Sequence, residues 1–244
     1  QNDVAAGIAE FAAGQSLGRA EDIRLDDMAA ALSQLLDDPE RRQLMAERGK
    51  ILVDGNGVAR VLAAMHERQR FNRQSEFTIR PAGLSDKLLL WQWANDPLTR
   101  RNSFSSAAIS WDDHQAWCAK KLTAPDCRLW IMQIGDLPVA QIRYDRIVSE
   151  NGVAAEISFS VAPGFRGLQL GSRLLAATTP RAAVELAADH IHGVALQGNE
   201  ASHRAFLRAG FVAAEGRRID GRLCTVFRRD NQARSWSDDH VSLH

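Results

Sequence analysis

The apolar residues in the first 66 positions recur at helical spacing. One predicted helix carries a continuous apolar face, made of Leu25, Met28, Ala29, Leu32, Leu35 and Leu36. A second predicted helix begins with Asp38 as its N-cap and Pro39 in its first position, and Gly49 is expected to end it. A tight turn at residues 54–57 and a third amphipathic helix over residues 58–65 follow. Helices of this length make a core that is marginal by itself.

From residue 77 the pattern becomes a series of short apolar runs separated by turn residues. Pro180 is expected to kink or split a helix predicted over residues 168–187, just after Thr179. Further helices are predicted as two stretches within residues 84–122, separated by residues 102–106, and over residues 200–208. Strands are predicted over residues 77–81, 128–134, 139–147, 154–161, 190–196, 211–214 and 223–228. This order of elements predicts an α/β fold of the α+β kind, with a mixed sheet that carries helices on its faces.

Composition limits the class of function. The 244 residues are 45% hydrophobic and 25% charged with a net charge of +0, so nucleic acid is not an expected partner. No apolar run is long enough to span a membrane and no signal peptide is visible, so no membrane partner is expected. Cys118, Cys127 and Cys224 are odd in number and scattered, which is typical of free thiols in a reducing cytoplasm. They lack metal-ligand spacing, and His190 and His192 lie in a predicted strand, so no metal is expected.

One hexapeptide carries the strongest chemical signal. Residues 166–171 read Arg-Gly-Leu-Gln-Leu-Gly, and they lie between a predicted strand and a predicted helix. Such a loop can hold a diphosphate, because free backbone N–H groups point outward and the helix dipole favours negative charge. Glycine lets the backbone approach the ligand closely, since it has no Cβ. The loop therefore predicts a site for a ligand that carries a diphosphate, such as coenzyme A.

Residues 77–229 resemble the GCN5-related N-acetyltransferase (GNAT) superfamily, whose hallmark loop is [Gln/Arg]-x-x-Gly-x-[Gly/Ala]. Arg166 and Gly171 match this loop, and the Val-Ala-Pro-Gly of residues 161–164 matches the approach to it. Gln169 stands at the middle glycine, where a side chain is tolerated if φ stays negative but crowds the pyrophosphate. The Asn-x-x-[Ser/Ala]…[Tyr/Phe]…Gly-Phe ending of the family is matched at Asn199, Ser202, Phe206, Gly210 and Phe211.

The resemblance implies acetyl-CoA as cosubstrate, no metal, and direct transfer within a ternary complex. In such enzymes the fourth strand carries a bulge and splays from the fifth, so that free N–H groups pair with the pantetheine arm. By analogy an N–H near Val161 stabilises the thioester oxyanion, and Asn199 holds the pantetheine arm or the splayed strand. The residues implied in cofactor binding are Phe159, Ser160, Val161, Arg166, Gly167, Leu168, Gln169, Gly171, Ser172, Asn199, Ser202 and Phe206.

Acetyl transfer to an amine also needs proton transfer. An ammonium ion is not a nucleophile, so a base must remove a proton, and Glu156 is the candidate base, acting directly or through water. The alternative for Glu156 is an ordinary strand-edge carboxylate paired with an arginine. The departing thiolate needs a proton, but Phe206 stands where relatives carry a tyrosine. Tyr144, the only tyrosine, is expected to be a core or edge aromatic, and Ser202 is either a weak donor or a cap. The general acid stays unassigned.

In this family the first two helices build the acceptor site. Four of the six tryptophans lie within residues 91–117, and two or three of them are expected to pack the helices on the sheet. The remaining aromatics are suited to stack a nucleobase or sugar, with an arginine on a phosphate. The candidate acceptor residues are Trp93, Asn95, Arg100, Arg101, His114 and Trp117. Their pattern is similar to that of nucleotide-sugar N-acetyltransferases of pseudaminic acid synthesis, and ribosomal-protein acetyltransferases share parts of it.

Residues 1–66 resemble the end of a GT-B-type protein, the UDP-sugar hydrolase of the same pathway. The strongest matching element is Val-Asp-Gly-x-Gly at residues 53–57. Because the chain begins at Gln1 and not at methionine, we expect a trimmed chain or a fragment of a hydrolase–acetyltransferase fusion. The resemblance implies a catalytically inactive helical remnant over residues 1–66, a linker over 67–76, the acetyltransferase domain over 77–229 and a disordered tail over 230–244.

The sequence is compatible with three functions. The first is a cytoplasmic, monomeric or homodimeric N-acetyltransferase acting on the 4-amino group of a UDP-linked amino-dideoxy sugar. The second is acetylation of a protein N-terminus, including that of a ribosomal protein, or of a small amine such as an aminoglycoside. An acidic acceptor cleft favours this second function, because cationic substrates need carboxylates. The third is a non-catalytic CoA-binding module, which Gln169 and Phe206 motivate.

Overall fold

The computed structural model describes residues 5, 7–9, 11–19, 21–53, 76–150 and 152–231. The chain divides into two compact units, residues 1–63 with 110–113 and residues 64–109 with 114–244. The predicted turn at residues 54–57 and the predicted helix over 58–65 lie outside the described residues. So do the linker, except for Glu76, and the tail beyond Asn231.

The first unit contains the helices α2 (Leu25–Asp37) and α3 (Pro39–Leu52). The predicted start of α3 is confirmed: Pro39 occupies the first turn, and the Asp38 carboxylate accepts a hydrogen bond from the N–H of Arg41 at 2.9 Å. The predicted stop at Gly49 is wrong. The helix continues to Leu52, because the Gly49 carbonyl still accepts a hydrogen bond from Val53 at 2.9 Å.

The apolar face predicted for α2 is present but exposed. Leu25 is 84% exposed, Leu36 72% and Leu32 59%, and Ala31 is the buried residue of this helix. The periodicity therefore identified the helix correctly, but it did not identify a face buried in this chain.

The second unit is built on a seven-stranded mixed sheet in the order β1-β2-β3-β4-β5-β7-β6. Neighbouring strands are antiparallel except β4 and β5, which are parallel. The mixed sheet predicted from the order of elements is therefore confirmed. The strands are β1 (Thr78–Pro81), β2 (Cys127–Ile134), β3 (Leu137–Ser149), β4 (Gly152–Val161), β5 (His190–Leu196), β6 (Val212–Ile219) and β7 (Arg222–Asp230).

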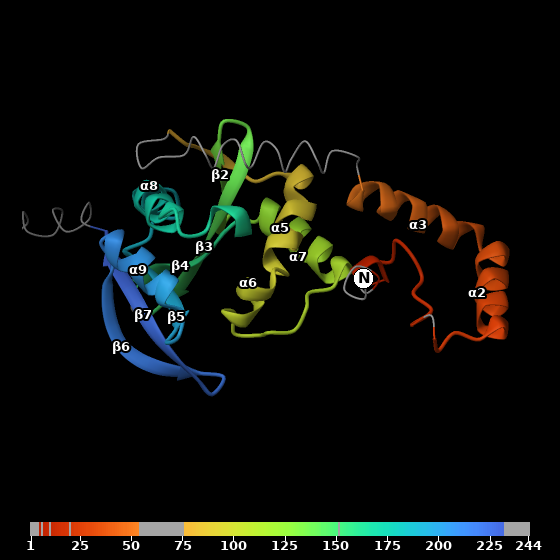
Figure 1. Ribbon diagram of the computed structural model, residues 1–244. Helices are drawn as coiled ribbons and strands as arrows, with labels where there is room; N and C mark the ends of the chain where they lie inside the picture. Colours follow the sequence, from red (N-terminus) through yellow and green to blue (C-terminus); the bar gives the residue numbers. More distant parts are fainter. Residues whose placement is uncertain are drawn as a thin grey trace, which may run out of the picture. The chain divides into compact units, whose positions relative to one another are not determined.

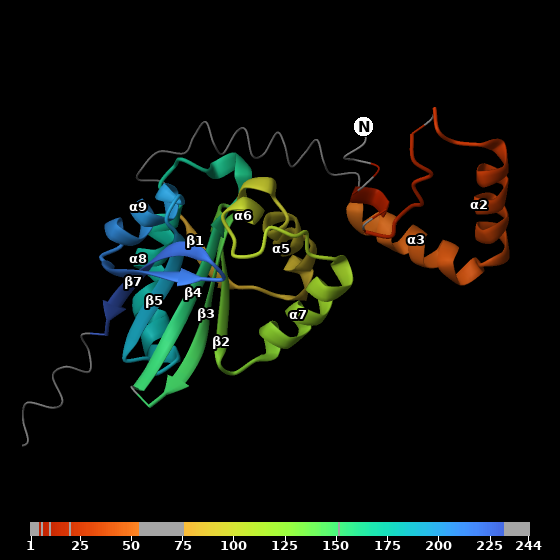
Figure 2. The same cartoon turned by 90° about the horizontal axis from the view of Figure 1, so that it is seen from below.

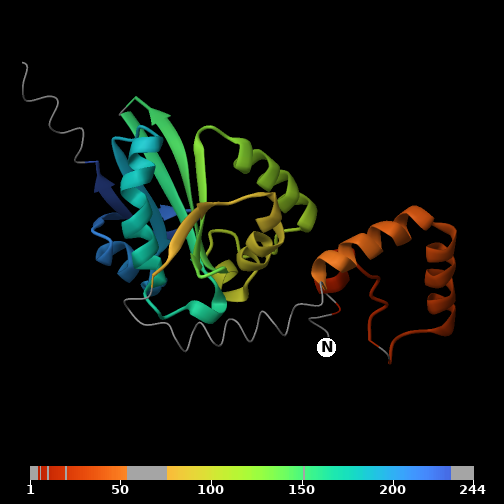
Figure 3. The ribbon, with the colours of Figure 1, turned by 90° about the horizontal axis from the view of Figure 1, so that it is seen from above.

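Helices lie on both faces of this sheet. The helices α8 (Leu170–Glu185) and α9 (Glu200–Arg208) lie on one side, and α5 (Lys87–Ala94), α6 (Pro97–Arg101) and α7 (Trp111–Thr123) lie on the other (Figures 1, 2 and 3). Short 3-10 turns precede α5 and α8, at Leu84–Asp86 and Pro163–Phe165.

The region of residues 84–122 has one more break than predicted. The predicted break after α6 is present, but a second break separates α5 from α6 at Asn95 and Asp96. A proline disfavours helical backbone at the residue before it. Asp96, which precedes Pro97, accordingly has the non-helical angles φ −55° and ψ 133°. The Asp96 carboxylate then caps α6 by accepting the N–H of Thr99 at 2.9 Å.

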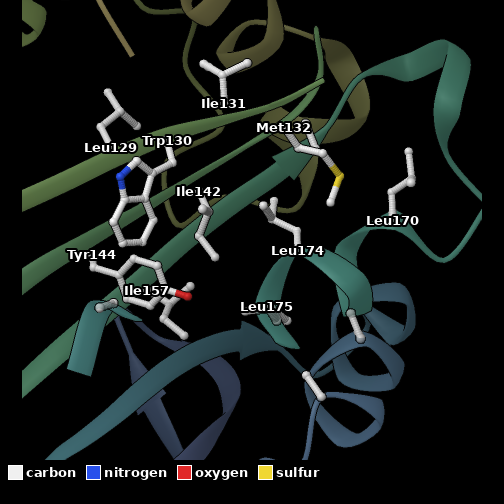
Figure 4. Close-up of a cluster of buried hydrophobic side chains, with 14 of the residues drawn as sticks. Leu129, Trp130, Ile131, Met132, Ile142, Tyr144, Ile157, Leu170, Leu174 and Leu175 are labelled. Atoms are coloured by element: carbon white, nitrogen blue, oxygen red, sulfur yellow. The ribbon is translucent and has the colours of Figure 1, made fainter. Parts of the chain in front are cut away.

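The core between the sheet and α8 fixes the position of that helix. Ile142, Tyr144 and Ile157 of the sheet face Leu174 and Leu175 of α8 (Figure 4). The Tyr144 hydroxyl lies 2.8 Å from the hydroxyl of Thr178 and 3.1 Å from that of Thr179.

Of the kink or split predicted at Pro180, the split is wrong, since α8 runs unbroken from Leu170 to Glu185. Pro180 lies on the exposed side of the helix. Leu174 and Leu175 before it, and Ala182 and Ala183 after it, are all buried in the core, and this packing holds both parts of the helix on the sheet.

Candidate functional site

The strands β4 and β5 separate in the middle of the sheet. Their parallel pairing runs from Ala154–His190 to Ile157–Gly193 in the described ladder. Beyond this point β4 continues on β3 to Val161, and β5 continues on β7 to Leu196. The two central strands therefore open a gap at their carboxyl ends, as the family resemblance implied.

Two N–H groups of β4 point into this gap. The N–H of Ala162 donates to the carbonyl of Val139 on β3 at 2.9 Å. Because backbone groups alternate in direction along a strand, Ser160 directs its N–H toward β3, whereas Phe159 and Val161 direct theirs toward the gap. The expected bulge is absent from β4, whose register with β3 is unbroken from Gly152 to Val161. The separation arises instead where β5 turns away with β7.

The loop before α8 adopts left-handed backbone at two positions. Gly167 has φ 82°, which glycine adopts without a steric penalty. Gln169, the N-cap of α8, has φ 61° and ψ 16°, so the negative φ that was the condition for tolerating a side chain there is not present. An unbranched side chain tolerates this region at modest cost, and Gln169 is exposed, so its side chain extends outward. The N–H groups of the first turn of α8 have no partner within the helix, which suits an anion.

Gly171 is a packing glycine. It is buried, and a Cβ on it would lie 3.0 Å from Cε2 of Phe159 and 3.4 Å from the Cβ of Ala205. The absence of a side chain therefore lets α8 lie close to β4 and α9. Next to it, the Ser172 hydroxyl donates to the carbonyl of Gln169 at 2.8 Å, and Leu168 is partly buried against the core.

Arg166 links the loop to the helices on the other side of the sheet. Its guanidinium donates to the Asp96 carboxylate and, at 3.1 Å, to the hydroxyl of Thr99. Burial opposes the charged form of Asp96, but the hydrogen bonds from Arg166 and Thr99 outweigh it and lower the pKa of Asp96. Arg166, predicted to bind the cofactor, is thus engaged by a protein carboxylate.

Two residues after β5 that were predicted to bind the cofactor have structural roles. Asn199 is the N-cap of α9, and its side-chain oxygen accepts the N–H of Ser202 at 3.3 Å. Phe206 is 2% exposed, so its ring belongs to the core. The ring lies over β5, where a Cβ on Gly193 would be 2.3 Å from Cζ of Phe206, and it stacks on Phe227 at 4.8 Å between centroids.

Glu156 lies beside a histidine. Its Oε2 is 3.4 Å from Nε2 of His192, and its side chain is 47% exposed. The hydrogen bond with His192 lowers the pKa of Glu156, against partial burial. The arginine partner considered for this glutamate is therefore replaced by an imidazole. Tyr144, in contrast, is fully buried with a pKa raised to about 12 by burial, which confirms it as a core aromatic.

Three of the predicted acceptor residues pack inside the unit. Trp93 is 7% exposed and belongs to the core. His114 is 3% exposed, and its Nε2 lies 2.8 Å from the carbonyl of Lys87. Trp117 stacks on His114 with the guanidinium of Arg143 5.2 Å from its ring centre. These side chains join α7 to α5 and to the sheet.

Two further predicted acceptor residues, Asn95 and Arg100, hold the loop after α6. Asn95 both donates to the carbonyl of Ile109 at 2.9 Å and accepts its N–H at 2.8 Å. Arg100 donates to the carbonyl of Ala94 at 2.6 Å and to the hydroxyl of Ser103 at 3.2 Å, with longer bonds to two loop carbonyls. Both residues therefore hold the segment after α6 in place.

A pocket of about 650 Å³ opens beside this loop, and it is lined by Pro97, Arg100, Arg101, Phe104, Ser106, Ala108 and Arg222. Arg222, which the sequence did not indicate, donates to the carbonyls of Ser103 at 2.5 Å and Arg101 at 3.3 Å. Figure 1 shows the tip of the β6–β7 hairpin beside the loop after α6. None of these lining residues carries a carboxylate, so the pocket is cationic.

Comparison with known proteins identifies acetyltransferases, both by a family model and by similar solved structures. A family model described as an acetyltransferase (GNAT) domain matches residues 76–212. The spermidine N-acetyltransferase from Vibrio cholerae, solved with CoA and spermine, is similar with a TM-score of 0.58 at 14% identity, over 65% of this chain and 97% of that chain. RimL, a ribosomal-protein α-N-acetyltransferase solved with CoA, is similar with a TM-score of 0.55 at 14% identity, over 65% of this chain and 96% of that chain.

The aminoglycoside complex of AAC(6')-Ib with paromomycin and acetyl-CoA gives a TM-score of 0.55 at 15% identity, over 68% of this chain and 99% of that chain. At these identities the likeness establishes the fold alone. No curated protein matches the chain. Within the described ranges, no group of three or more His, Cys, Asp or Glu residues is arranged to hold a metal ion. No described helix is both long and apolar enough to cross a membrane.

Proposed function

The chain belongs to the GNAT acetyltransferase family, and on that premise we propose that it acetylates the amino group of an anionic, nucleotide-linked amino sugar. The resemblance of residues 91–117 to nucleotide-sugar N-acetyltransferases narrows this to the 4-amino group of a UDP-linked amino-dideoxy sugar. The main support for an anionic acceptor is the pocket whose lining includes Arg100, Arg101 and Arg222.

Acetyl-CoA fits the gap between β4 and β5. The N–H groups of Phe159 and Val161 are available to its pantetheine arm, and the first turn of α8 with the loop at Gly167 is available to its diphosphate. The bound cosubstrate supplies an activated acetyl group as a thioester. Asn199 acts by capping α9, and Gly171 acts by holding α8 close to β4.

We assign the oxyanion contact to the N–H of Phe159 in place of Val161. The oxyanion donor must lie near the amine, which must in turn reach a proton acceptor directly or through water. Val161 is five residues from Glu156, roughly 17 Å along the strand, whereas Phe159 is three residues away, roughly 10 Å. Both N–H groups face the gap, so the shorter separation favours Phe159.

The arginine pocket lies at a distance suited to a sugar nucleotide. Ile157 pairs with Gly193, so Phe159 is level with Ala195, which pairs with Thr225 on β7. Arg222 is three residues beyond Thr225, roughly 10 Å along the strand. A diphosphate held by Arg222 and Arg101 would place an amino group, one pyranose ring away, toward the gap. Guanidinium groups bind phosphate oxygens in bidentate fashion.

A polycationic acceptor is a poorer match. Spermine and an aminoglycoside are bound in two of the similar structures, and such polycations need carboxylates at their ammonium groups. The pocket offers three arginines instead. A thiol-release assay should therefore show turnover with a UDP-linked 4-amino sugar and little with spermidine or paromomycin. The same amino sugar without its nucleotide is the matched control, and it should require a much higher concentration. Preferred turnover of the polyamine would refute the proposed acceptor.

We also infer that residues 1–66 are a helical remnant of a GT-B-like UDP-sugar hydrolase, without catalytic function. The exposed leucines of α2 support this, because they form an apolar face of the kind that a larger domain would cover. Leu32→Asp and Leu36→Asp should leave acetyl transfer and the melting temperature unchanged. A loss of activity in these variants would give the segment a role in catalysis.

A further inference from the structure

We propose that His192 is the group that accepts the proton of the acceptor amine, and that Glu156 positions it. This inference rests on the proposed acetyl transfer and reassigns the base within it. Glu156 and His192 are directly opposite each other in the parallel β4–β5 ladder. Their side chains therefore lie on the same face of the sheet, with Oε2 and Nε2 3.4 Å apart.

The pair lies at the closed end of the gap. The next rung, Ile157 with Gly193, is the last before the two strands separate. Glu156 is also opposite Asp145 on β3, whose carboxylate accepts a hydrogen bond from Lys121 of α7 at 2.7 Å. The pair is therefore on the face that carries α5, α6 and α7, the side from which the acceptor enters. The His192 side chain is 17% exposed, so water reaches it.

The chemistry of the two groups favours the imidazole as the acceptor of the proton. A carboxylate that already accepts a hydrogen bond from an imidazole is a weak base, and the pKa of Glu156 is lowered for this reason. An imidazole nitrogen is intrinsically a stronger base than a carboxylate, and histidine is the side chain that most often acts as a general base. With Nε2–H donating to Glu156, the Nδ1 lone pair of His192 is the one that accepts a proton.

Every proton and electron pair of the transfer has a destination. One proton of the ammonium group passes through water to Nδ1 of His192, and the freed nitrogen lone pair attacks the thioester carbon. The C–N bond forms, the C–S bond breaks, and the sulfur leaves with its electron pair. The second proton on nitrogen goes to that sulfur, the third stays on the amide, and the imidazolium releases its proton to water. Neither an oxidant nor a metal is required.

The charged groups around the pair, Glu156 left aside, are two carboxylates and three cations, so the carboxylate of Glu156 brings their sum to zero. Asp145 is engaged by two cations, at 2.7 Å from Lys121 and 2.6 Å from Arg143. His190 lies next along β5, with its ring centre 5.9 Å from that of His192. On β7, Arg228 is opposite His192 and is hydrogen bonded to Asp230 at 2.7 Å. The carboxylate of Glu156 is therefore the charge that stabilises an imidazolium at His192.

The test is the pH dependence of kcat/KM for the full chain with whichever amine the wild type acetylates. The wild type should lose activity at acidic pH. His192→Gln should abolish this acid limb and lower kcat about 10²- to 10³-fold. Glu156→Gln should keep the limb but move it to lower pH, because the imidazolium loses its carboxylate. His190→Gln is the matched control and should show the wild-type profile.

Two independent readouts separate this proposal from a structural role. The Kd for CoA, measured by calorimetry, should be unchanged in all three variants. The NMR titration midpoint of the His192 imidazole should fall in Glu156→Gln, whatever the acceptor. An acid limb that survives in His192→Gln would overturn the proposal, as would wild-type kinetics in both variants. A wild type that turns over no amine would instead refute the proposed function, and this inference with it.

Discussion

Arg166 and Asp96 are seventy residues apart, and a hydrogen bond joins their side chains. Arg166 belongs to the loop before α8, and Asp96 is the N-cap of α6. The same carboxylate oxygen also accepts the N–H of Thr99. One ion pair thus fixes the loop proposed for CoA relative to the helices proposed for the acceptor.

We expect Asp96→Ala to destabilise the fold by about 2–3 kcal/mol, because it removes a helix cap and a charged hydrogen bond together. Asp96→Asn should cost about 1 kcal/mol, since its amide oxygen can still cap α6. Urea denaturation of both variants measures the difference. Equal costs would show that the cap contributes nothing beyond the ion pair with Arg166, and an unchanged stability of Asp96→Asn would show that the ion pair contributes nothing.

The same pair predicts a pH dependence of stability. The pKa of Asp96 is lower in the folded chain, so the unfolded chain binds more protons at acidic pH. The stabilisation should be complete above about pH 5 and should be lost as the pH falls through about 4 and below. Asp96→Asn should flatten this part of the stability curve relative to the wild type.

Gly171→Val should destabilise the fold by about 1–3 kcal/mol, because the added atoms would meet the ring of Phe159 and the methyl group of Ala205. Because Phe159 also carries the proposed oxyanion donor, kcat should fall as well. Gly164→Ala is the matched control, since a Cβ there has no atom within 4 Å, and it should be neutral. Loss of CoA binding with full stability would instead assign Gly171 to the phosphate site.

Much of this fold follows from local pattern. The strand predicted over residues 190–196 and the helix over 200–208 match β5 and α9 in both limits, because each is a short amphipathic run bounded by turn residues. The start of α3 followed from Asp38 and Pro39, whose capping chemistry is local. The family loop and its flanking strand also led to the gap between β4 and β5.

The acceptor side was harder to predict, because packing and binding use the same residue types. Trp93 and His114 have the spacing and chemistry of ligand-binding residues, but both are buried in the unit. Arg222 reaches the backbone of Ser103 across 119 positions, and no local pattern encodes that contact. The left-handed backbone at Gln169 could not be predicted from the sequence either, since residues other than glycine rarely adopt it.

Arg101→Gln should raise the KM for a nucleotide-linked acceptor about 10-fold or more, with kcat little changed. A charged hydrogen bond to phosphate contributes about 1.5–3 kcal/mol, and Arg101 lines the pocket with an exposed side chain. The effect should shrink at high salt, because exposed charges are screened. Arg24→Gln on the first unit is the matched control and should leave the KM unchanged. An unaltered KM in Arg101→Gln would remove this arginine from the acceptor site.

Gly193 and Phe206 define a steric pair at the rung where the central strands separate. A Cβ on Gly193 would lie 2.3 Å from Cζ of Phe206, and the ring is stacked on Phe227, which is opposite Gly193 on β7. Gly193→Ala should therefore cost about 1–3 kcal/mol or more, because the buried ring has little room to move. Phe206→Leu alone should cost about 1–2 kcal/mol through lost packing.

The double variant Gly193→Ala with Phe206→Leu should be more stable than the sum of the single costs, because the smaller side chain admits the new methyl group. Urea denaturation of the four proteins gives this coupling energy, which we expect at about 1 kcal/mol or above for residues in direct contact. Additive costs would mean that the ring does not restrict position 193. The rescue should extend to activity, since the position of this rung sets where β4 and β5 begin to separate.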